Sequence, residues 1–217
     1  MENQIQKPNM PLIGEKAPDF TQQSTHGPIT FSEFNKGSWV ILFSHPADFT
    51  PVCTTELSEF AVDKDFYAAH NTKLMGLSID SIHSHLAWVN NVREKTGVYM
   101  DFPILADLDM KVANLYGMLH PGASATAAVR AVFFIDPEGI VRLVLYYPLN
   151  IGRNMDEVKR ILIALQTADE KAVALPANWR PGDKAIVPPP KTLAEMDARI
   201  ASTEYEQVDF YLAKKTI

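Results

Sequence analysis

The most constraining stretch of the chain is 39–56, where an apolar run ends at a proline and a Thr/Pro-rich segment follows. Residues 39–44 are aromatic and aliphatic and predict a buried strand, which ends before Pro46. Thr50, followed by a proline, indicates the start of a helix. Cys53 then lies in the first helical turn, where unpaired backbone N–H groups and the helix dipole favour an anion. A thiol in such a position ionises readily, so we expect a thiolate nucleophile.

Two strand-to-helix units follow one another in this part of the chain. The helix that contains Cys53 is expected to continue to about His70, because its apolar residues keep a helical period. Residues 73–80 predict a second buried strand, and residues 81–95 predict a helix that ends at a Thr-Gly pair. Successive units of this kind are typical of a parallel α/β core.

The second half of the sequence predicts a hairpin followed by a helix. Residues 128–135 and 140–147 are two strands joined by Asp-Pro-Glu-Gly, which has the residue preferences of a type I turn. An extended piece is expected at 102–107 and a short helix at 110–116. A capping residue at Asn154, three before a glutamate, indicates the start of a longer helix.

The pattern changes near residue 172, where prolines become frequent and only a short helix at 193–200 is expected. We therefore predict one compact domain over 1–171 and a C-terminal arm over 172–217. The arm either folds back on its own domain or lies across a neighbouring subunit. Apolar side chains such as Trp179 and Tyr211 would be poorly covered in a monomer, which favours dimerisation through the arm.

Composition excludes several classes of function. The net charge is −6, from 20 basic and 26 acidic residues, and no Lys/Arg cluster is present, so nucleic-acid binding is not expected. No segment approaches the roughly 18 consecutive apolar residues of a membrane span. Residues 1–8 lack the apolar stretch of a signal peptide, and a single cysteine fits a reducing compartment. A cytoplasmic protein without a membrane partner is the expected result.

The sequence indicates neither a cofactor nor a metal. It has no Gly-rich phosphate loop, so a nucleotide cofactor is not expected. His83 and His85 are two residues apart on a predicted helix and therefore face different directions. They do not form a metal-binding pair.

The spacing Pro46-x-x-x-Thr50-x-x-Cys53 resembles the active-site signature of the peroxiredoxins, most closely that of their single-cysteine branch. The likeness covers about residues 11–190. It includes Leu77–Ser81, His85–Trp88, Phe102–Ile104, Arg130, Tyr147–Pro148 and Gly152–Asn154. This resemblance implies an α/β, thioredoxin-like fold, with a central mixed sheet flanked by helices and a C-terminal extension.

The resemblance also implies roles for individual residues. Cys53 would be the peroxidatic thiolate, Thr50 and Arg130 would hold the peroxide beside it, and Pro46 would close the pocket. A guanidinium and a hydroxyl donor would stabilise the negative charge that develops on the peroxide as sulfur attacks it. An arginine inside an apolar strand also needs a charged partner, which the thiolate supplies.

Three further residues match family positions. Arg153 would be a second cation near the site, and Glu56 is expected to organise Arg130 or Arg153 rather than to act as an acid or base. His45 either orients the pocket through a hydrogen bond or has a purely structural role.

The function implied is that of a thiol-dependent peroxidase, which reduces hydrogen peroxide and alkyl hydroperoxides through a Cys53 sulfenic acid. No second cysteine is present to resolve it, so an external thiol or redox protein must reduce it unless the Cys53 sulfurs of two subunits meet. A shielded pocket disfavours that second route. A homodimer, or a ring of dimers, is the implied assembly. The alternative is a holdase or redox-signalling assembly with little turnover. A disulfide oxidoreductase is disfavoured because Glu56 occupies the place of the second cysteine of Cys-x-x-Cys.

Overall fold

The protein is described by a computed structural model that covers residues 10–217. The segment 1–8, on which the expectation about a signal peptide rests, lies outside the described residues. The chain divides into two compact units, Met1–Met155 and Asp156–Ile217. The functional division into 1–171 and 172–217 stays a prediction.

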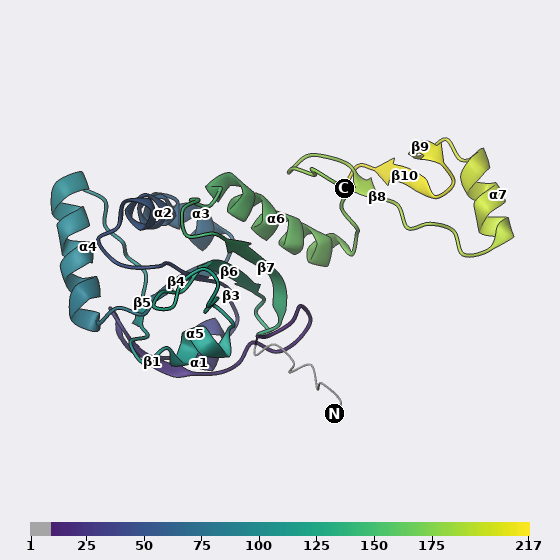
Figure 1. Ribbon diagram of the computed structural model, residues 1–217. Coiled ribbons are helices and arrows are strands. Elements are labelled where there is room, and N and C mark those ends of the chain that lie inside the picture. The colour runs from purple at the N-terminus through teal and green to yellow at the C-terminus, as the bar shows by residue number, and fades with distance from the viewer. Residues whose placement is uncertain (1–9) are drawn as a thin grey trace, which may run out of the picture. The chain divides into compact units, whose positions relative to one another are not determined.

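The first unit is built on a seven-stranded mixed sheet in the order β2-β1-β5-β4-β3-β6-β7 (Figure 1). Strands β3, β4 and β5 are parallel, whereas β6 is antiparallel to both β3 and β7. The predicted α/β architecture with a central mixed sheet is thereby confirmed. The strands are β1 (Thr21–Ser24), β2 (Gly27–Thr30), β3 (Trp39–Ser44), β4 (Thr72–Ser78), β5 (Ile104–Ala106), β6 (Arg130–Ile135) and β7 (Val141–Tyr147).

The predicted hairpin is present as β6 and β7, with Arg130 opposite Tyr147 in the antiparallel register. Its turn contains Gly139 at a φ of 77°, a left-handed conformation that favours glycine. The turn is closed by the Gly139 N–H, which donates to the carbonyl of Asp136 at 2.9 Å. The hairpin places Arg130 at the start of a strand that lies directly beside β3.

In the described part of the first unit, five helices connect or cover these strands: α1 (Phe31–Asn35), α2 (Pro51–Val62), α3 (Lys64–Ala69), α4 (Ile82–Thr96) and α5 (Lys111–Leu115). The single helix expected from the Cys53 segment to about His70 is instead two helices, which divide at Asp63. Helix α4 matches its predicted range closely. Its Ser81 hydroxyl accepts from the Ser84 N–H, and Gly97 ends it at a φ of 76°.

Strand β3 lies at the centre of the core, as the burial of the side chains on both of its faces shows. Alternate residues point to opposite faces of a strand, so Val40 and Leu42 join one apolar cluster. Phe43 points to the other face and stacks on Phe60 of α2, with ring centroids 4.1 Å apart. This contact fixes α2, and the cysteine in its first turn, over the sheet.

The second unit contains most of α6 (Met155–Lys171) and a three-stranded antiparallel sheet in the order β8-β10-β9. Its other elements are β8 (Ala185–Ile186), α7 (Leu193–Ala201), β9 (Glu206–Asp209) and β10 (Leu212–Lys215). The short helix expected at 193–200 is α7. Trp179, which was expected to be poorly covered, is only 3% exposed. Val208 and Tyr211, by contrast, are exposed. Within residues 10–217, no helix is long and apolar enough to cross a membrane.

Candidate active site

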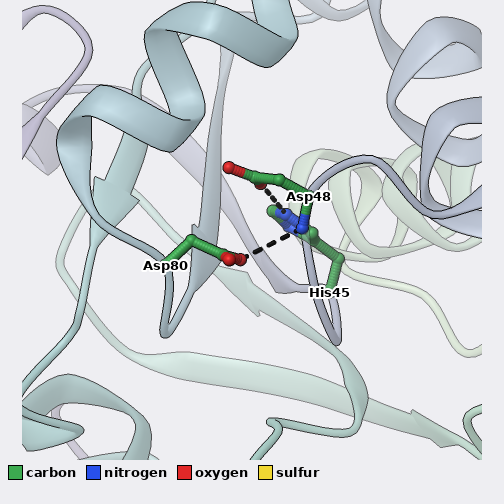
Figure 2. Close-up of side chains that lie close together, drawn as sticks. All are labelled: His45, Asp48 and Asp80. Carbon is green, nitrogen blue, oxygen red and sulfur yellow. Dashed lines mark hydrogen bonds and ion pairs between the residues drawn. The ribbon is translucent and has the colours of Figure 1, made fainter.

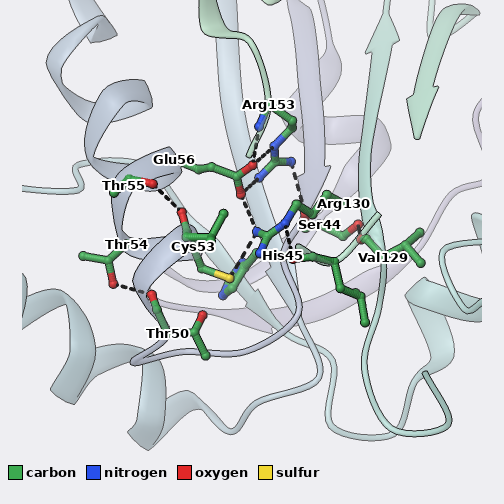
Figure 3. Close-up of polar contacts among 12 residues, drawn as sticks. Ser44, His45, Thr50, Cys53, Thr54, Thr55, Glu56, Val129, Arg130 and Arg153 are labelled. Carbon is green, nitrogen blue, oxygen red and sulfur yellow. Dashed lines mark hydrogen bonds and ion pairs between the residues drawn. The ribbon is translucent and has the colours of Figure 1, made fainter. Parts of the chain in front are cut away.

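Cys53 is the third residue of α2 and is fully buried (Figure 3). Thr50 is the N-cap in extended conformation and a proline follows it, so the helix begins where the sequence predicts. The loop 45–50 connects this helix to the end of β3. Cys53 therefore lies in the first turn of α2, near the free N–H groups, as expected.

Arg130 is the residue that contacts the sulfur. Its Nη1 lies 3.3 Å from the Sγ of Cys53, and the side chain is almost completely buried. Its Nε and Nη2 donate to the Leu149 carbonyl at 3.0 and 2.7 Å. With its fork held on one side by a carbonyl, the guanidinium presents its remaining nitrogen to the sulfur.

Glu56, one helical turn after Cys53, joins both arginines of the site. Its Oε2 accepts from Arg130 Nη1 at 2.6 Å and from Arg153 Nη2 at 2.7 Å. Its Oε1 accepts from the backbone N–H and the Nε of Arg153, at 2.8 and 3.0 Å. Glu56 thus contacts Arg130 and Arg153 together, whereas the sequence prediction named one or the other. Two cations, this carboxylate and a thiolate would form a set with no net charge.

Each of the three guanidinium nitrogens of Arg153 has a hydrogen-bond acceptor. Its Nη1 donates to the carbonyls of Ser44 and Ala131, both at 3.1 Å, and its guanidinium lies 5.3 Å from the ring centroid of Phe43. Burial lowers the pKa of Arg153, and the adjacent Glu56 carboxylate opposes that shift. Arg153 makes no hydrogen bond to the sulfur, but Glu56 joins it to Arg130, which does.

The Thr50 hydroxyl donates to the carbonyl of Ala47 at 2.8 Å. With its proton engaged there, the oxygen is free to accept a hydrogen bond from a substrate. This differs from the expectation of a hydroxyl that donates. Pro46 lies in the same loop and is partly buried.

His45 contacts a residue that the sequence prediction missed. Its Nε2 lies 3.0 Å from Oδ1 of Asp48, and its Nδ1 is buried without a hydrogen-bond partner. The other carboxylate oxygen of Asp48 lies 2.8 Å from Nδ1 of His85. The signal for this network was present only in part, since His85 belongs to a family-like segment and Asp48 is three residues from His45.

His45, Asp48 and Asp80 bring possible ligand atoms within 4.8 Å of one another (Figure 2). The Asp80 Oδ2 accepts from the Asp48 N–H at 3.0 Å and from the Ser78 hydroxyl at 2.6 Å. Both Asp48 oxygens face histidine nitrogens. A cation would have to displace these bonds, so the group is best described as a hydrogen-bond network.

Comparison with known proteins agrees with this geometry. A model of the AhpC/TSA family matches residues 13–144, and a model of the C-terminal domain of 1-Cys peroxiredoxin matches residues 164–202. Peroxiredoxin 2 of Caldanaerobacter subterraneus subsp. tengcongensis is 53% identical over 209 residues, which cover 96% of this chain and 94% of that protein. The chain belongs to the peroxiredoxin family.

Solved structures of other peroxiredoxins have the same fold. The yeast mitochondrial 1-Cys peroxiredoxin, whose thiol resolving mechanism proceeds via glutathione/thioredoxin systems, is 39% identical with a TM-score of 0.85. The match covers 96% of this chain and all of that one. A cysteine-to-serine mutant of peroxiredoxin 6 of Arenicola marina is 35% identical with a TM-score of 0.84, over 94% of this chain and 97% of its own. The predicted thioredoxin-like fold and thiol-dependent peroxidase activity are therefore confirmed for this peroxiredoxin.

Proposed function

We propose that Cys53 is the peroxidatic thiolate and that Arg130 and Thr50 bind the peroxide beside it. The observation that carries this assignment is the 3.3 Å contact between Arg130 Nη1 and the Cys53 sulfur, two side chains that are both buried. A guanidinium at that distance stabilises a thiolate and lies next to the position where substrate oxygen must arrive.

The first step is attack of the Cys53 sulfur on one oxygen of the peroxide. The S–O bond forms as the O–O bond breaks, so cysteine is oxidised to a sulfenic acid and the peroxide is reduced. The leaving oxygen takes a proton and departs as water from hydrogen peroxide, or as an alcohol from an alkyl hydroperoxide. Arg130 stabilises the negative charge that develops on this oxygen.

Thr50 and Pro46 have complementary roles in this step. The Thr50 oxygen accepts a hydrogen bond from the peroxide O–H, because its own proton is donated to the Ala47 carbonyl. This bond orients the substrate for in-line attack. Pro46 adds an apolar wall to the loop and keeps water from the sulfur.

Three supporting residues, Glu56, Arg153 and His45, hold the groups around Cys53 in place. Glu56 holds Arg130 and Arg153 in one buried network, and Arg153 adds a second positive charge behind the thiolate. His45, through Asp48, is a positioning residue at the end of the strand that leads into the site.

The sulfenic acid is returned to a thiol by an external reductant. Cys53 is the only cysteine of the sequence, so the chain cannot form an internal disulfide. A small thiol condenses with the sulfenic acid, releases water and leaves a mixed disulfide, which a second thiol then reduces. Because the similar yeast protein is resolved via glutathione/thioredoxin systems, we infer reductants of that class here.

We also propose a cytoplasmic homodimer formed through the segment 172–217. Exposed apolar side chains on this segment support the inference, with Val208 81% and Leu193 76% exposed. A reducing cytoplasm suits a thiol that must return to its reduced form after each cycle.

One equivalent of hydrogen peroxide, followed by mass spectrometry of peptides, tests the central assignment. We expect one added oxygen on Cys53, trapped as a sulfenic acid adduct by a dimedone-type reagent. Cys53→Ser should consume no peroxide with any thiol donor. An unmodified Cys53, or a serine variant with peroxidase activity, would contradict the proposal.

A further inference from the structure

Asp48 lies five residues before Cys53 and is held at three points by residues outside the peroxide site. Its backbone N–H donates to Oδ2 of Asp80 at 3.0 Å. Its side-chain oxygens lie 3.0 Å from His45 Nε2 and 2.8 Å from His85 Nδ1. Figure 2 shows the contacts of Asp48 with Asp80 and His45 as dashed lines. Asp48 is itself almost fully buried.

His85 lies between two hydrogen-bond acceptors. Its Nδ1 faces the Asp48 carboxylate, and its Nε2 lies 3.1 Å from the carbonyl of Leu105. A carbonyl only accepts, and so does an ionised carboxylate, so each ring nitrogen of His85 must carry a proton. A neutral ring would set a nitrogen lone pair against one of these acceptors in a fully buried position.

The alternative, a proton on Asp48, is disfavoured. Burial raises the pKa of the Asp48 carboxyl, but the hydrogen bonds from His45 and His85 outweigh burial and hold that pKa well below its usual range. His45 donates one N–H to Asp48 and leaves its other nitrogen without a partner, as in a neutral ring. The ionised Asp48 carboxylate and the doubly protonated His85 ring therefore form an ion pair.

The loop next to this ion pair is strained. Phe49 has a φ of 56°, a left-handed conformation that is rare and unfavourable for an aromatic residue. Strain of this kind persists only where the surroundings fix the backbone. The following residue, Thr50, occupies the N-cap position of the helix that carries Cys53, and its hydroxyl is the proposed hydrogen-bond acceptor for the peroxide.

We propose that His85, Asp48 and Asp80 form a loop anchor, a buried set of positioning residues that holds the strained 46–50 loop in the geometry needed for peroxide attack. In this anchor His85 carries both ring protons. The inference rests on the proposed reaction at Cys53. It assigns a role in the chemistry to His85 on α4 and to Asp80, two residues after β4, although the side chain that hydrogen-bonds to the sulfur is that of Arg130.

The anchor acts on substrate geometry rather than on the sulfur itself. Loss of the His85–Asp48 bond releases the loop, and with it Thr50 and Pro46, while the Arg130 contact to Cys53 remains. A displacement of about 1 Å in a catalytic group lowers a rate about 100-fold. Oxidation by peroxide should therefore fall while alkylation of the thiolate, which needs no bound peroxide, stays nearly unchanged.

The test compares His85→Gln with His83→Gln, an exposed histidine on the same helix. Stopped-flow measurement of Cys53 oxidation by hydrogen peroxide should show a rate constant about 10- to 100-fold lower for His85→Gln. The iodoacetamide alkylation rate at pH 7 should change by less than about threefold, and His83→Gln should match the wild type in both. Asp48→Asn should behave like His85→Gln, and the double variant should be no slower than either single one.

The loop-anchor proposal would be overturned if Cys53 in His85→Gln were oxidised at the wild-type rate. An equal fall in the rate constants of oxidation and alkylation would also overturn it. A second measurement needs no variant at the anchor: long-range proton–nitrogen spectra of the reduced wild-type protein at pH 7. Both ring nitrogens of His85 should be protonated, and a nitrogen lone pair on His85 would contradict the proposal. If wild-type Cys53 is not oxidised at all, the proposed function fails instead, which the peroxide-trapping experiment detects separately.

Discussion

At the scale of single residues, Glu56 is the carboxylate that balances the positive charge of the site, because it accepts hydrogen bonds from two buried arginines. Glu56→Gln would leave Arg130 and Arg153 buried beside each other with one carboxylate fewer. Removing one partner of a buried ion pair costs about 3–5 kcal/mol. We expect a loss of this size in the free energy of unfolding, measured in urea.

The control for this substitution is Glu59→Gln, on the same helix but exposed to solvent. Surface substitutions stay within about 0.5 kcal/mol of the wild type. If Glu56→Gln were as stable as this control, the buried charge set would contribute no net stability, contrary to the prediction.

His45 predicts a pH dependence of stability. Burial lowers the pKa of His45, and the neighbouring Asp48 only partly offsets this effect. The unfolded chain then binds a proton more readily than the folded one, so this contribution is complete above about pH 6.5 and is lost as the pH falls below it. Measured from pH 7.5 to 5, the urea midpoint of the wild type should fall relative to that of His45→Gln, which lacks this contribution. His83→Gln, at an exposed histidine, is the control. If the urea midpoints of the wild type and of His45→Gln changed equally with pH, His45 would not be a neutral buried group.

At the scale of secondary structure, the elements predicted from the sequence are those with a clear local signal. Strand β3, the start of α2 and the β6–β7 hairpin follow from an apolar run, a cap and a turn sequence. The break at Asp63 has no such signal, because neither proline nor glycine interrupts the helical period there. Strand β1 was missed because its residues, Thr-Gln-Gln-Ser, are polar, and it is recognised only by its pairing with β2 and β5.

The candidate site follows the same rule. The sequence predicts Cys53 from a motif of known spacing, and it predicts Arg130 and Glu56 from their match to family positions. The bond between Asp48 and His85 joins residues 37 apart in the sequence, and no periodicity brings them together. Such long-range polar pairs depend on how α4 packs beside the loop, which local propensity does not specify.

The hairpin that positions Arg130 gives a prediction about its turn. Gly139 has a left-handed φ of 77°, and a Cβ atom there would lie 3.1 Å from Oδ1 of Asn35. Gly139→Ala should therefore lower the free energy of unfolding by about 1 kcal/mol or more. Gly122→Ala, where a Cβ would meet nothing within 4 Å, is the matched control. Equal thermal midpoints for the two variants would show that the turn tolerates alanine without strain.

At the scale of the whole molecule, the reacting site and the proposed dimerisation segment belong to different compact units. Among the described residues, every side chain that hydrogen-bonds to Cys53, Arg130 or Glu56 lies within Met1–Met155. The first chemical step should therefore not need the second unit. We therefore expect peroxide turnover to persist when assembly is disrupted. A holdase that depends on its assembled form would lose its activity under the same condition.

Substituting both Val208 and Tyr211 by aspartate tests this separation, since these side chains are 81% and 57% exposed. We expect light scattering to show a mass near 24.2 kDa for the variant and a multiple of it for the wild type. The rate constant of Cys53 oxidation should stay within about twofold of the wild type, because distant sites act independently. Val62→Asp, at a 64% exposed position in the first unit, controls for added charge. An unchanged mass would place the dimer contact on another surface, and a slower oxidation at unchanged mass would show that the second unit contributes to the reacting site.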